Sequence, residues 1–285
     1  MTVLDAQDRA TPGQRLAEAI RRPGTLPCIG IYDVFSASIA GQHFDALFVS
    51  GFGLAASYYG LPDIGFIAWP DVASLVQRVR TVFPGHHILV DIDDGYCDPE
   101  VACHVVSVLE ASGASGIVLE DQKRPRRCGH FEGKQIMDLD EYLAKLRQVL
   151  ATRRDLVVVA RTDTADPHDM ERRVMAFADS GADAVLIDGI PDLDIVRRLA
   201  ERIAVPFCFN QIAGGKSPPF TLGQLDAAGV ALAIYSTPCL FAAQAAIEDA
   251  MVDLKNRDGT LEGNRIRVRD CTRVLEENLA RRDSR

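Results

Sequence analysis

Residues 87–95 read HILVDIDDG, an apolar run that ends in acidic residues, and this pattern decides the fold. The run is apolar on both faces of an extended chain, which is typical of a strand in a parallel sheet covered by helices on both sides. Such runs are followed by stretches that can form a helix, such as DPEVACHVVSVLEASG at 98–113. Seven further runs occur, at 28–33, 46–51, 116–121, 156–162, 184–189, 206–210 and 232–236. Eight strand–helix units predict an α/β fold, a closed (β/α)₈ barrel of the TIM type.

The chain length agrees with this fold, because such a barrel takes about 250 residues and the chain has 285. We therefore expect a single domain over residues 1–285. A doubly wound sheet is the alternative, but YDVFSASIAG at 32–41 lacks the closely spaced glycines of a dinucleotide-binding turn. Residues from about 240 to 285 predict two more helices separated by a turn. Helices beyond the eighth unit need a surface to cover, so we expect them to exchange or pack between subunits of a homo-oligomer.

Composition and charge exclude several classes of protein. The net charge is −9, which argues against nucleic acid and against an anionic membrane as partners. The N-terminal segment lacks the apolar core of a secretory signal, and no later segment approaches a charge-free span of about 20 residues. We therefore expect a cytoplasmic protein whose partner is a small molecule.

Polar residues stand at the carboxyl ends of the predicted strands, where the loops of such a barrel converge on one mouth. Asp91 and Asp93 end the third strand, two residues apart and therefore on one face, and Glu120 ends the fourth. Crowded carboxylates repel one another unless a divalent cation with oxygen ligands joins them. These three acids predict a site for Mg²⁺, or for Mn²⁺, with some of the acids acting through water. For Asp94 and Asp121, helix capping or surface solvation is an equal alternative.

Cys128 lies in RPRRCGHFEGK, residues 124–134, directly after the fourth predicted strand. The alternatives for it are a buried apolar filler, a disulfide partner, a metal ligand and a reactive thiolate. The seven cysteines are odd in number and include no CxxC pair, which disfavours disulfides and a structural zinc. Neighbouring arginines favour the thiolate and make the sulfur a usable acid or base near neutral pH. His130 would orient the thiol or bind a substrate carboxylate.

Six segments in register resemble the isocitrate lyase and phosphoenolpyruvate mutase superfamily, from about residue 28 to residue 245. The resemblance is strongest to its short lyases, the group of methylisocitrate lyase, dimethylmalate lyase, oxaloacetate acetylhydrolase and carboxyphosphonoenolpyruvate mutase. It implies a (β/α)₈ barrel and a dimer of dimers that exchanges the eighth helix. The segments are LFVSGFGLAASYYGLPDIGF at 47–66, VDIDDGY at 90–96, LEDQ at 119–122, RRCGH at 126–130, ARTD at 160–163 and FNQIAGGKSP at 209–218.

The resemblance also implies roles for individual residues. Mg²⁺ would bind through Asp93, with Asp91 and Glu120 mostly through water. Cys128 would deliver a proton to the carbanion that carbon–carbon cleavage releases, or remove it in reverse. Backbone amides at residues 50–52 would hold the carboxylate of a 2-oxo or 2-hydroxy acid, and Arg161 would clamp a carboxylate. With Cys128, the expected catalytic residues are Arg161, His130 and Arg126, and the expected substrate-binding residues are Tyr32, Ser50, Gly51, Phe52, Asp63, Gly129, Asp188 and Asn210.

Five positions at this mouth depart from the family pattern. Arg126 replaces a lysine, and because arginine keeps its proton, any proton-transfer role of that lysine is lost. Asp188 and Ala213 replace glutamates, Asp94 replaces a threonine, and Phe52 replaces a small residue. Phe52 and Ala213 predict a substrate pocket with an altered apolar shape.

These features predict a Mg²⁺-dependent carbon–carbon lyase. Its substrate would be a 2-hydroxy di- or tricarboxylate of the methylisocitrate or alkylmalate type, and its products a 2-oxo acid and a carboxylate. Cys128 favours lyase chemistry, because many phosphonopyruvate enzymes of the family lack this cysteine. The alternatives are a phosphonopyruvate or carboxyphosphonoenolpyruvate mutase, an oxaloacetate hydrolase or decarboxylase, and a degenerate barrel without catalysis.

Overall fold

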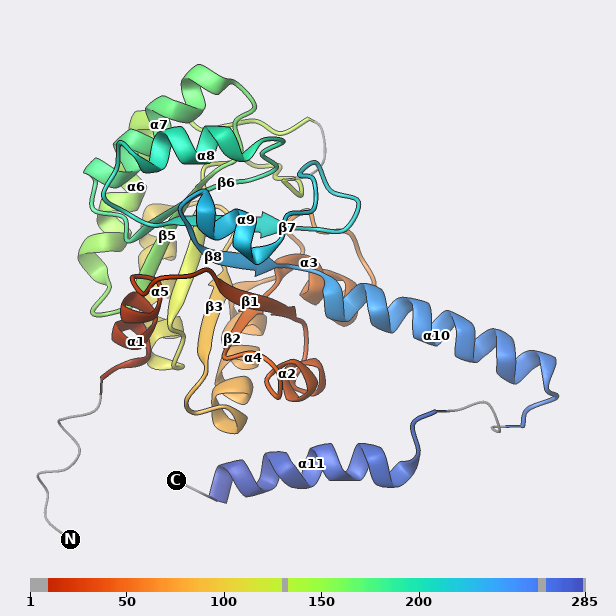
Figure 1. Cartoon of the computed structure of the whole chain (residues 1–285). Helices are drawn as coiled ribbons and strands as arrows, with labels where there is room; N and C mark the ends of the chain where they lie inside the picture. Colours follow the sequence, from red (N-terminus) through yellow and green to blue (C-terminus); the bar gives the residue numbers. More distant parts are fainter. Residues whose placement is uncertain (1–9, 130–132, 261–264, 284–285) are drawn as a thin grey trace, which may run out of the picture.

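Eight parallel strands form the closed barrel that the sequence predicts (Figure 1). The computed structural model describes residues 10–129, 133–260 and 265–283. Each strand pairs with the next one in the chain, and the last pairs with the first to close the sheet. The strands are β1 (Leu26–Ile31), β2 (Ala46–Val49), β3 (His87–Asp91), β4 (Gly116–Glu120), β5 (Val157–Thr162), β6 (Ala184–Ile187), β7 (Phe207–Gln211) and β8 (Val230–Tyr235).

Helices cover the outside of the barrel and alternate with the strands. Proline in the first turn begins several of them, because its fixed φ suits a position whose amide needs no helical partner. The helices that follow the strands are α2 (Val34–Ala40), α4 (Trp69–Val82), α5 (Pro99–Ala111), α6 (Leu139–Thr152), α7 (Pro167–Asp179), α8 (Leu193–Ala200), α9 (Leu222–Ala227) and α10 (Pro238–Asn256). The other elements are α1 (Pro12–Ala19), α3 (Gly51–Leu54), the π-helical turn η1 (Ala55–Tyr59) and α11 (Val268–Asp283).

The interior of the barrel is packed with apolar side chains, and α1 lies across its amino-terminal end. Leu16 and Ile20 belong to the same buried cluster as inward-facing strand residues such as Leu89. The approach of α1 is so close that a Cβ atom on Gly13 would lie 2.0 Å from the carbonyl oxygen of Asp155. The barrel is therefore a filled core, and its chemistry is confined to the carboxyl-terminal end of the strands.

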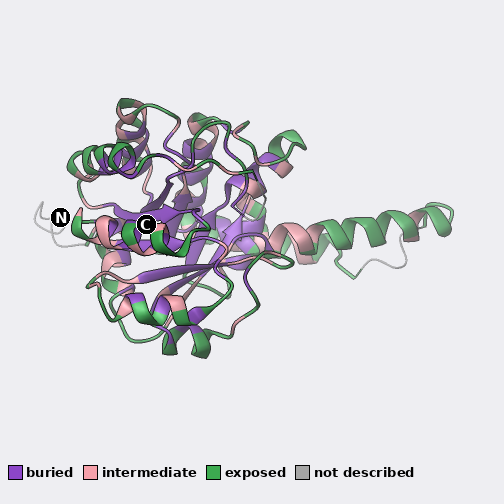
Figure 2. Ribbon diagram, turned by 90° about the horizontal axis from the view of Figure 1, so that it is seen from above, coloured by how far each residue is buried: buried purple, intermediate pink, exposed green. Residues whose placement is uncertain are grey.

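The C-terminal helices α10 and α11 lie outside the wall of the barrel. None of the residues of α10 is buried, and Figure 2 shows this helix as an exposed rod that projects from the buried core. Its exposed apolar residues include Ile247, Met251 and Val252. α11 contacts α2 and α4, where the amide of Asn278 donates to Ser38 Oγ at 2.7 Å. In the described part of the chain, no helix is long and apolar enough to span a membrane.

His87, at the start of β3, leads us to expect an acid-dependent loss of stability. Burial, with the charges of Arg15 and Arg80, lowers the pKa of His87 to about 4 against the opposing effect of Asp45. In the unfolded chain the imidazole of His87 has a pKa of about 6.5. Between that pH and about 4, the unfolded chain therefore binds more protons at His87 than the folded chain does. The contribution of His87 to the free energy of unfolding is therefore complete above about pH 6.5 and declines as the pH falls toward about 4.

A His87→Gln variant tests this effect, because glutamine does not titrate. Its free energy of unfolding in urea should decrease less than that of the wild type between about pH 7 and about pH 5. His43→Gln is the matched control, since His43 is exposed, and it should behave as the wild type does. If the free energy of unfolding of His87→Gln decreases as much as that of the wild type over this pH interval, other groups cause the effect.

Candidate active site

A narrow polar cavity lies at the carboxyl ends of the strands, and most of the predicted site residues line it. Its volume is about 20 Å³, which is room for about one water molecule. All of its lining residues except Ile212 and Ser236 belong to the predicted site. The described lining consists of Ser50, Phe52, Asp63, Asp91, Arg126, Cys128, Gly129, Arg161, Asp188, Asn210, Ile212 and Ser236.

The predicted metal acids converge beside Gly51. A Cβ atom on this glycine would lie 3.4 Å from Asp91 Oδ2, 3.5 Å from Asp93 Oδ1 and 3.8 Å from Asp63 Oδ1. The expectation that Asp91 and Asp93 share one face of a strand is wrong, because β3 ends at Asp91 and Asp93 has a φ of +52°. The amide of Asp93 donates to Asp91 Oδ1 at 3.2 Å. A tight left-handed turn, not strand alternation, brings the two carboxylates together.

The guanidinium of Arg126 lies among these acids. Its Nη1 is 2.6 Å from Asp63 Oδ1, its Nε is 3.0 Å from Glu120 Oε1, and its Nη2 is 3.1 Å from Asp93 Oδ1. The four side chains are at most 9% exposed, so solvent screens these ion pairs little. Burial opposes the charge, but Asp93 and Glu120 outweigh it, and the pKa of Arg126 lies well above its ordinary value. Arg126 therefore supplies positive charge inside the cluster of acids.

The charge of this cluster and its oxygen donors fit a hard divalent cation. Burial raises the pKa of Asp91 and Glu120 and raises that of Asp93 to about 8, and the neighbouring arginines oppose this only in part. Two buried oxygens, Asp93 Oδ1 and Glu120 Oε2, accept no hydrogen bond from a described group, and their only close cationic contacts among the described residues are ion pairs at 3.1 Å and 3.3 Å with Arg126 and Arg161. Among the described residues, no three His, Cys, Asp or Glu side chains are close enough to hold an ion directly. The donor set therefore fits Mg²⁺ bound chiefly through water.

Arg161 is the second buried cation of the cavity. Its Nε and Nη2 donate to the two carboxylate oxygens of Asp163, each at 3.0 Å, and Nη2 also donates to Asp188 Oδ2 at 3.0 Å. Glu120 Oε2 lies 3.3 Å from Nη2. Burial opposes the charge, but these carboxylates hold the pKa of Arg161 well above its ordinary value. The contacts fix the plane of the guanidinium, which is the geometry that clamping a carboxylate requires.

Asp188 links the seventh and eighth strands to the segment that carries Cys128. Asn210 Nδ2 donates to Asp188 Oδ1 at 2.8 Å, and Ser236 Oγ donates to Asn210 Oδ1 at 2.6 Å. Cys128 is 8% exposed, and after it a Cβ atom on Gly129 would lie 1.9 Å from Asp188 Oδ2. Glycine is required there, because any side chain would push the segment with Cys128 away from the barrel.

Gln122 also positions this segment, a role that the strand-end pattern did not predict. Its Nε2 donates to the carbonyl oxygen of Arg127 at 2.8 Å, and its Oε1 accepts from the Arg127 amide at 3.0 Å. Nε2 also donates to Asp163 Oδ2, so the support of Arg161 and the loop of Cys128 share one partner. The signal was present, because Gln122 directly follows the acids at the end of β4. The predicted residue His130 lies outside the described residues.

Ser50 caps the amino-terminal end of α3, where a substrate carboxylate is expected to bind. Its Oγ accepts the amide of Gly53 at 3.1 Å. The amide of Ser50 itself donates to the carbonyl oxygen of Ile31 at 3.3 Å, so this amide is already engaged within the barrel. Gly51 and Phe52 are the first two residues of α3. The backbone amides at the start of a helix have no hydrogen-bond acceptor within the helix. The amides available for a carboxylate are therefore these two.

Tyr32 lies apart from the other predicted substrate-binding residues. It lines a separate, mainly apolar cavity of about 830 Å³ together with Phe35 of α2 and Cys239 of α10. Burial, with the charge of Asp33, raises the pKa of Tyr32. Tyr32 therefore does not line the polar cavity, although it directly follows β1 as the strand-end pattern requires.

Comparisons with known proteins agree with this geometry. A family model for phosphoenolpyruvate phosphomutase matches residues 16–255. The 2-methylisocitrate lyase of Salmonella typhimurium is 32% identical over 277 residues, covering 94% of this chain and 92% of the relative. The 2,3-dimethylmalate lyase of Eubacterium barkeri is 30% identical over 239 residues, covering 81% and 82%.

Comparison with solved structures agrees with these sequence matches. A crystal structure of 2,3-dimethylmalate lyase superposes with a TM-score of 0.89 at 29% identity, covering 95% of this chain and 94% of the other. Oxaloacetate acetylhydrolase in complex with 3,3-difluorooxalacetate gives a TM-score of 0.88 at 30% identity, covering 96% and 95%. The chain therefore belongs to the phosphoenolpyruvate mutase/isocitrate lyase superfamily and is an enzyme of its carbon–carbon lyase and mutase type.

Proposed function

We propose that the protein is a Mg²⁺-dependent lyase that cleaves a carbon–carbon bond of a 2-hydroxy di- or tricarboxylate of the methylisocitrate or alkylmalate type. The products would be a 2-oxo acid and a second carboxylate. The observation that carries this proposal is the convergence of buried acids beside Gly51, at the same cavity as Cys128 and Arg161. Its support from the comparisons is the similarity to relatives named 2-methylisocitrate lyase and 2,3-dimethylmalate lyase.

The acids beside Gly51 would hold the metal ion. Asp93 would be the direct ligand, and Asp91 and Glu120 would bind mainly through water. When bound, Mg²⁺, or Mn²⁺ with its similar preference for oxygen ligands, would stabilise negative charge on the hydroxyl oxygen of the substrate. Arg126 is in ion-pair contact with two of these acids and would balance part of their charge.

The remaining residues would bind the substrate and transfer a proton. The amides of Gly51 and Phe52 would bind the carboxylate beside the hydroxyl group, and Arg161 and Asn210 would hold the second half. As the hydroxyl group passes its proton to a solvent water molecule, the carbon–carbon bond would break, a carbonyl group would form on the first half, and the electron pair of the broken bond would pass to the second half as an enolate. The thiol of Cys128 would protonate that enolate carbon and regain a proton from solvent.

Hydrolysis of an oxaloacetate-like acid is the second candidate within the superfamily. Oxaloacetate acetylhydrolase has an overall fold as similar to this chain as that of dimethylmalate lyase. In that reaction water, not an internal hydroxyl group, would attack the carbonyl carbon before the bond breaks. The same acids and the same cavity would serve, so only the products distinguish the two reactions.

Product analysis by NMR tests the proposed function. With Mg²⁺, the protein should convert 2,3-dimethylmalate to pyruvate and propionate, or methylisocitrate to pyruvate and succinate. Removal of the metal with a chelator should lower the rate by roughly 100-fold or more, and Mg²⁺ or Mn²⁺ should restore it. A full rate after chelation would contradict the metal role. Turnover of oxaloacetate or phosphonopyruvate alone would favour the alternatives.

We also propose that the working form is a homo-oligomer, a dimer of dimers in which α10 packs against another copy of the chain. The support is physical, because α10 has no buried residue although Ile247, Met251 and Val252 are apolar. Apolar side chains on a helix need a surface that excludes water. A second copy of the chain would offer that surface.

A further inference from the structure

Residues 122–129 follow β4 and carry Cys128, and we call them the thiol arm. The arm is closed at its base by an antiparallel bridge to Ile136. Beyond this base, two arginine side chains fasten the arm to the barrel mouth. Arg126 reaches the metal acids, and Arg124 reaches a separate carboxylate. The contact of Arg124 is the one that the proposed function leaves without a role.

Arg124 binds Asp94, the residue after the expected direct metal ligand. Its Nε donates to Asp94 Oδ2 at 2.9 Å and its Nη2 donates to Oδ1 at 2.8 Å, so the guanidinium and the carboxylate meet through two hydrogen bonds. The side chain of Asp94 is 1% exposed and that of Arg124 is 36% exposed. Helix capping and surface solvation were the alternatives for Asp94, and neither describes it. It is buried, and the N-cap of α5 is Asp98.

The turn that contains Asp94 is itself held by the barrel from two sides. The amide of Glu120 donates to the carbonyl oxygen of Asp93 at 2.9 Å. Lys145 Nζ of α6, a side chain buried below the turn's backbone, donates to the carbonyl oxygen of Asp94 at 2.9 Å. These bonds tie the turn to β4 and to α6, so Asp94 offers the thiol arm a fixed support. The ion pair therefore links the place of the arm to the place of the acids.

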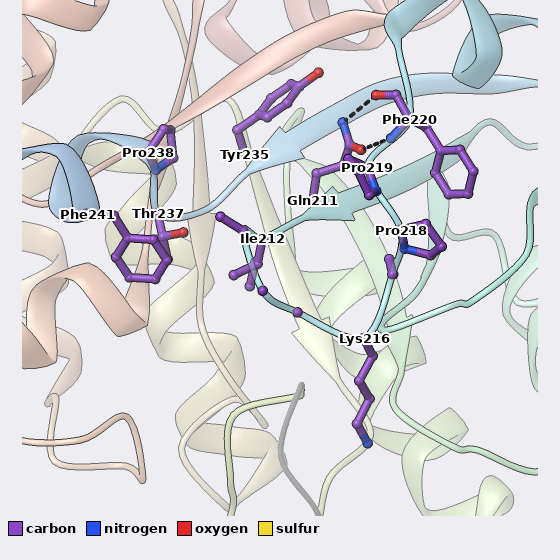
Figure 3. Close-up of a pocket in the computed structure, with 14 residues that line it drawn as sticks. Gln211, Ile212, Lys216, Pro218, Pro219, Phe220, Tyr235, Thr237, Pro238 and Phe241 are labelled. Carbon is purple, nitrogen blue, oxygen red and sulfur yellow. Dashed lines mark hydrogen bonds between the residues drawn. The ribbon is translucent and has the colours of Figure 1, made fainter.

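The loop after β7, which is opposite β3 in the strand order, is fastened differently (Figure 3). Gln211 Nε2 donates to the carbonyl oxygen of Phe220 at 3.1 Å, and Gln211 Oε1 accepts the amide of Phe220 at 2.7 Å. These bonds join β7 to its own loop and involve no charged group. Both residues line a cavity of about 860 Å³, whose described lining includes neither Arg124 nor Cys128. In this comparison, the ion pair between two loops belongs to the side of the mouth that carries the thiol.

We propose that Arg124 and Asp94 are positioning residues, whose ion pair fastens the thiol arm to the turn with the metal acids and so places Cys128 for proton transfer. The inference rests on the proposed function, in which this thiol protonates the enolate. Arg126, two residues along the arm, contacts the acids, and Cys128, two residues further, lines the polar cavity. A displacement at Arg124 therefore reaches the sulfur through a short stretch of chain. A shift of about 1 Å in a reacting group can lower a rate about 100-fold.

Alkylation of the full chain by iodoacetamide, at saturating Mg²⁺, tests the fastening without turnover. Peptide mass spectrometry measures the rate at each cysteine separately. In Arg124→Met, Cys128 should react roughly tenfold faster than in the wild type, because two charge-assisted hydrogen bonds no longer hold the arm. Cys28 and Cys208 lie inside the barrel and should stay protected, because their alkylation requires unfolding of the whole barrel.

Two further variants and a control complete this measurement. Asp94→Asn should accelerate the alkylation of Cys128 as Arg124→Met does, although a direct effect of charge on the thiolate would change the two rates in opposite directions. The double variant should react no faster than either single one, because both changes break the same contact. Arg202→Met breaks an exposed ion pair away from the mouth and is the matched control, with Cys128 reacting at the wild-type rate.

The kinetic parameters test the positioning role. In Arg124→Met, kcat should fall roughly 10- to 100-fold, while KM changes by less than about twofold because the groups proposed to bind the substrate remain. Arg124→Lys keeps the charge but loses the two-point contact, so its kcat should be intermediate. A loss of stability alone would lower the melting temperature and leave the kcat of the folded enzyme unchanged.

Three results would overturn the inference. One is an unchanged rate of alkylation at Cys128 in Arg124→Met. Another is equal acceleration at Cys28 and Cys208, which would show that the ion pair stabilises the whole fold instead. The third is wild-type kcat in a variant whose Cys128 reacts faster. If the variants behave as expected in alkylation but the wild type cleaves no 2-hydroxy acid, the proposed function fails and the contact between arm and turn stands.

Discussion

Replacement of Cys128 by serine is expected to lower kcat for carbon–carbon cleavage by roughly 10²- to 10⁴-fold, the usual contribution of a proton-transfer group. Serine keeps the approximate size of the side chain, so the contact of Gly129 with Asp188 should persist. Its hydroxyl group is a much weaker acid than a thiol, so protonation of the enolate becomes slow. Steady-state kinetics should show this loss, while calorimetry shows unchanged binding of Mg²⁺.

Cys271→Ser is the control for this experiment, because Cys271 does not line the polar cavity. It lies in α11, which packs on α2 and α4 outside the barrel wall. Its kcat and melting temperature should match those of the wild type. A Cys128→Ser enzyme with wild-type kcat would remove the thiol from the mechanism. Loss of Mg²⁺ binding in the same variant would mean that the substitution disturbs the acids, and the kinetic result would then indicate a positioning role for the cysteine.

Replacement of Arg126 by methionine is expected to destabilise the metal-free protein by about 3–5 kcal/mol, since it leaves three buried carboxylates without their common partner. Mg²⁺ should reverse much of this loss, because the ion supplies the missing positive charge at the same acids. Unfolding in urea, with chelator and with saturating Mg²⁺, measures both effects.

Two further variants sharpen the result for Arg126. Arg126→Lys keeps the charge but loses the fork of donors that reaches Asp63, Asp93 and Glu120 together, so its stability in chelator should be intermediate. Arg202→Met breaks a pair with Glu171 that is about half exposed, and it should cost less than about 1 kcal/mol in either condition. An Arg126→Met protein as stable as the wild type in chelator would show that the buried ion pairs contribute no net stability.

The barrel could be predicted because its strands are buried on both faces and so need unbroken apolar runs, as residues 87–91 illustrate. Helix α1 escaped the prediction, although Thr11 and Gln14 form a capping box that marks its start. The helix is held in place because Leu16 packs against residues of the barrel interior that are distant from it in the sequence. Local patterns carry no information about such a contact.

The strand-end rule located Asp91, Glu120 and Arg161 because the ends of all parallel strands in a barrel face one mouth. It could not predict the left-handed turn at Asp93, which depends on hydrogen bonding within the loop. Nor could it predict that Arg126 would reach into the acids. That placement depends on how the loop after β4 packs against the rest of the barrel mouth.

The position of α1 has a consequence for the order of events during turnover. Leu16 and Ile20 close the amino-terminal end of the barrel. A substrate and both of its products would therefore use the same entrance, at the carboxyl-terminal end. For a lyase of the proposed type, the fragment nearer that entrance would depart before the deeper one. The fold would thus set the order in which the products leave.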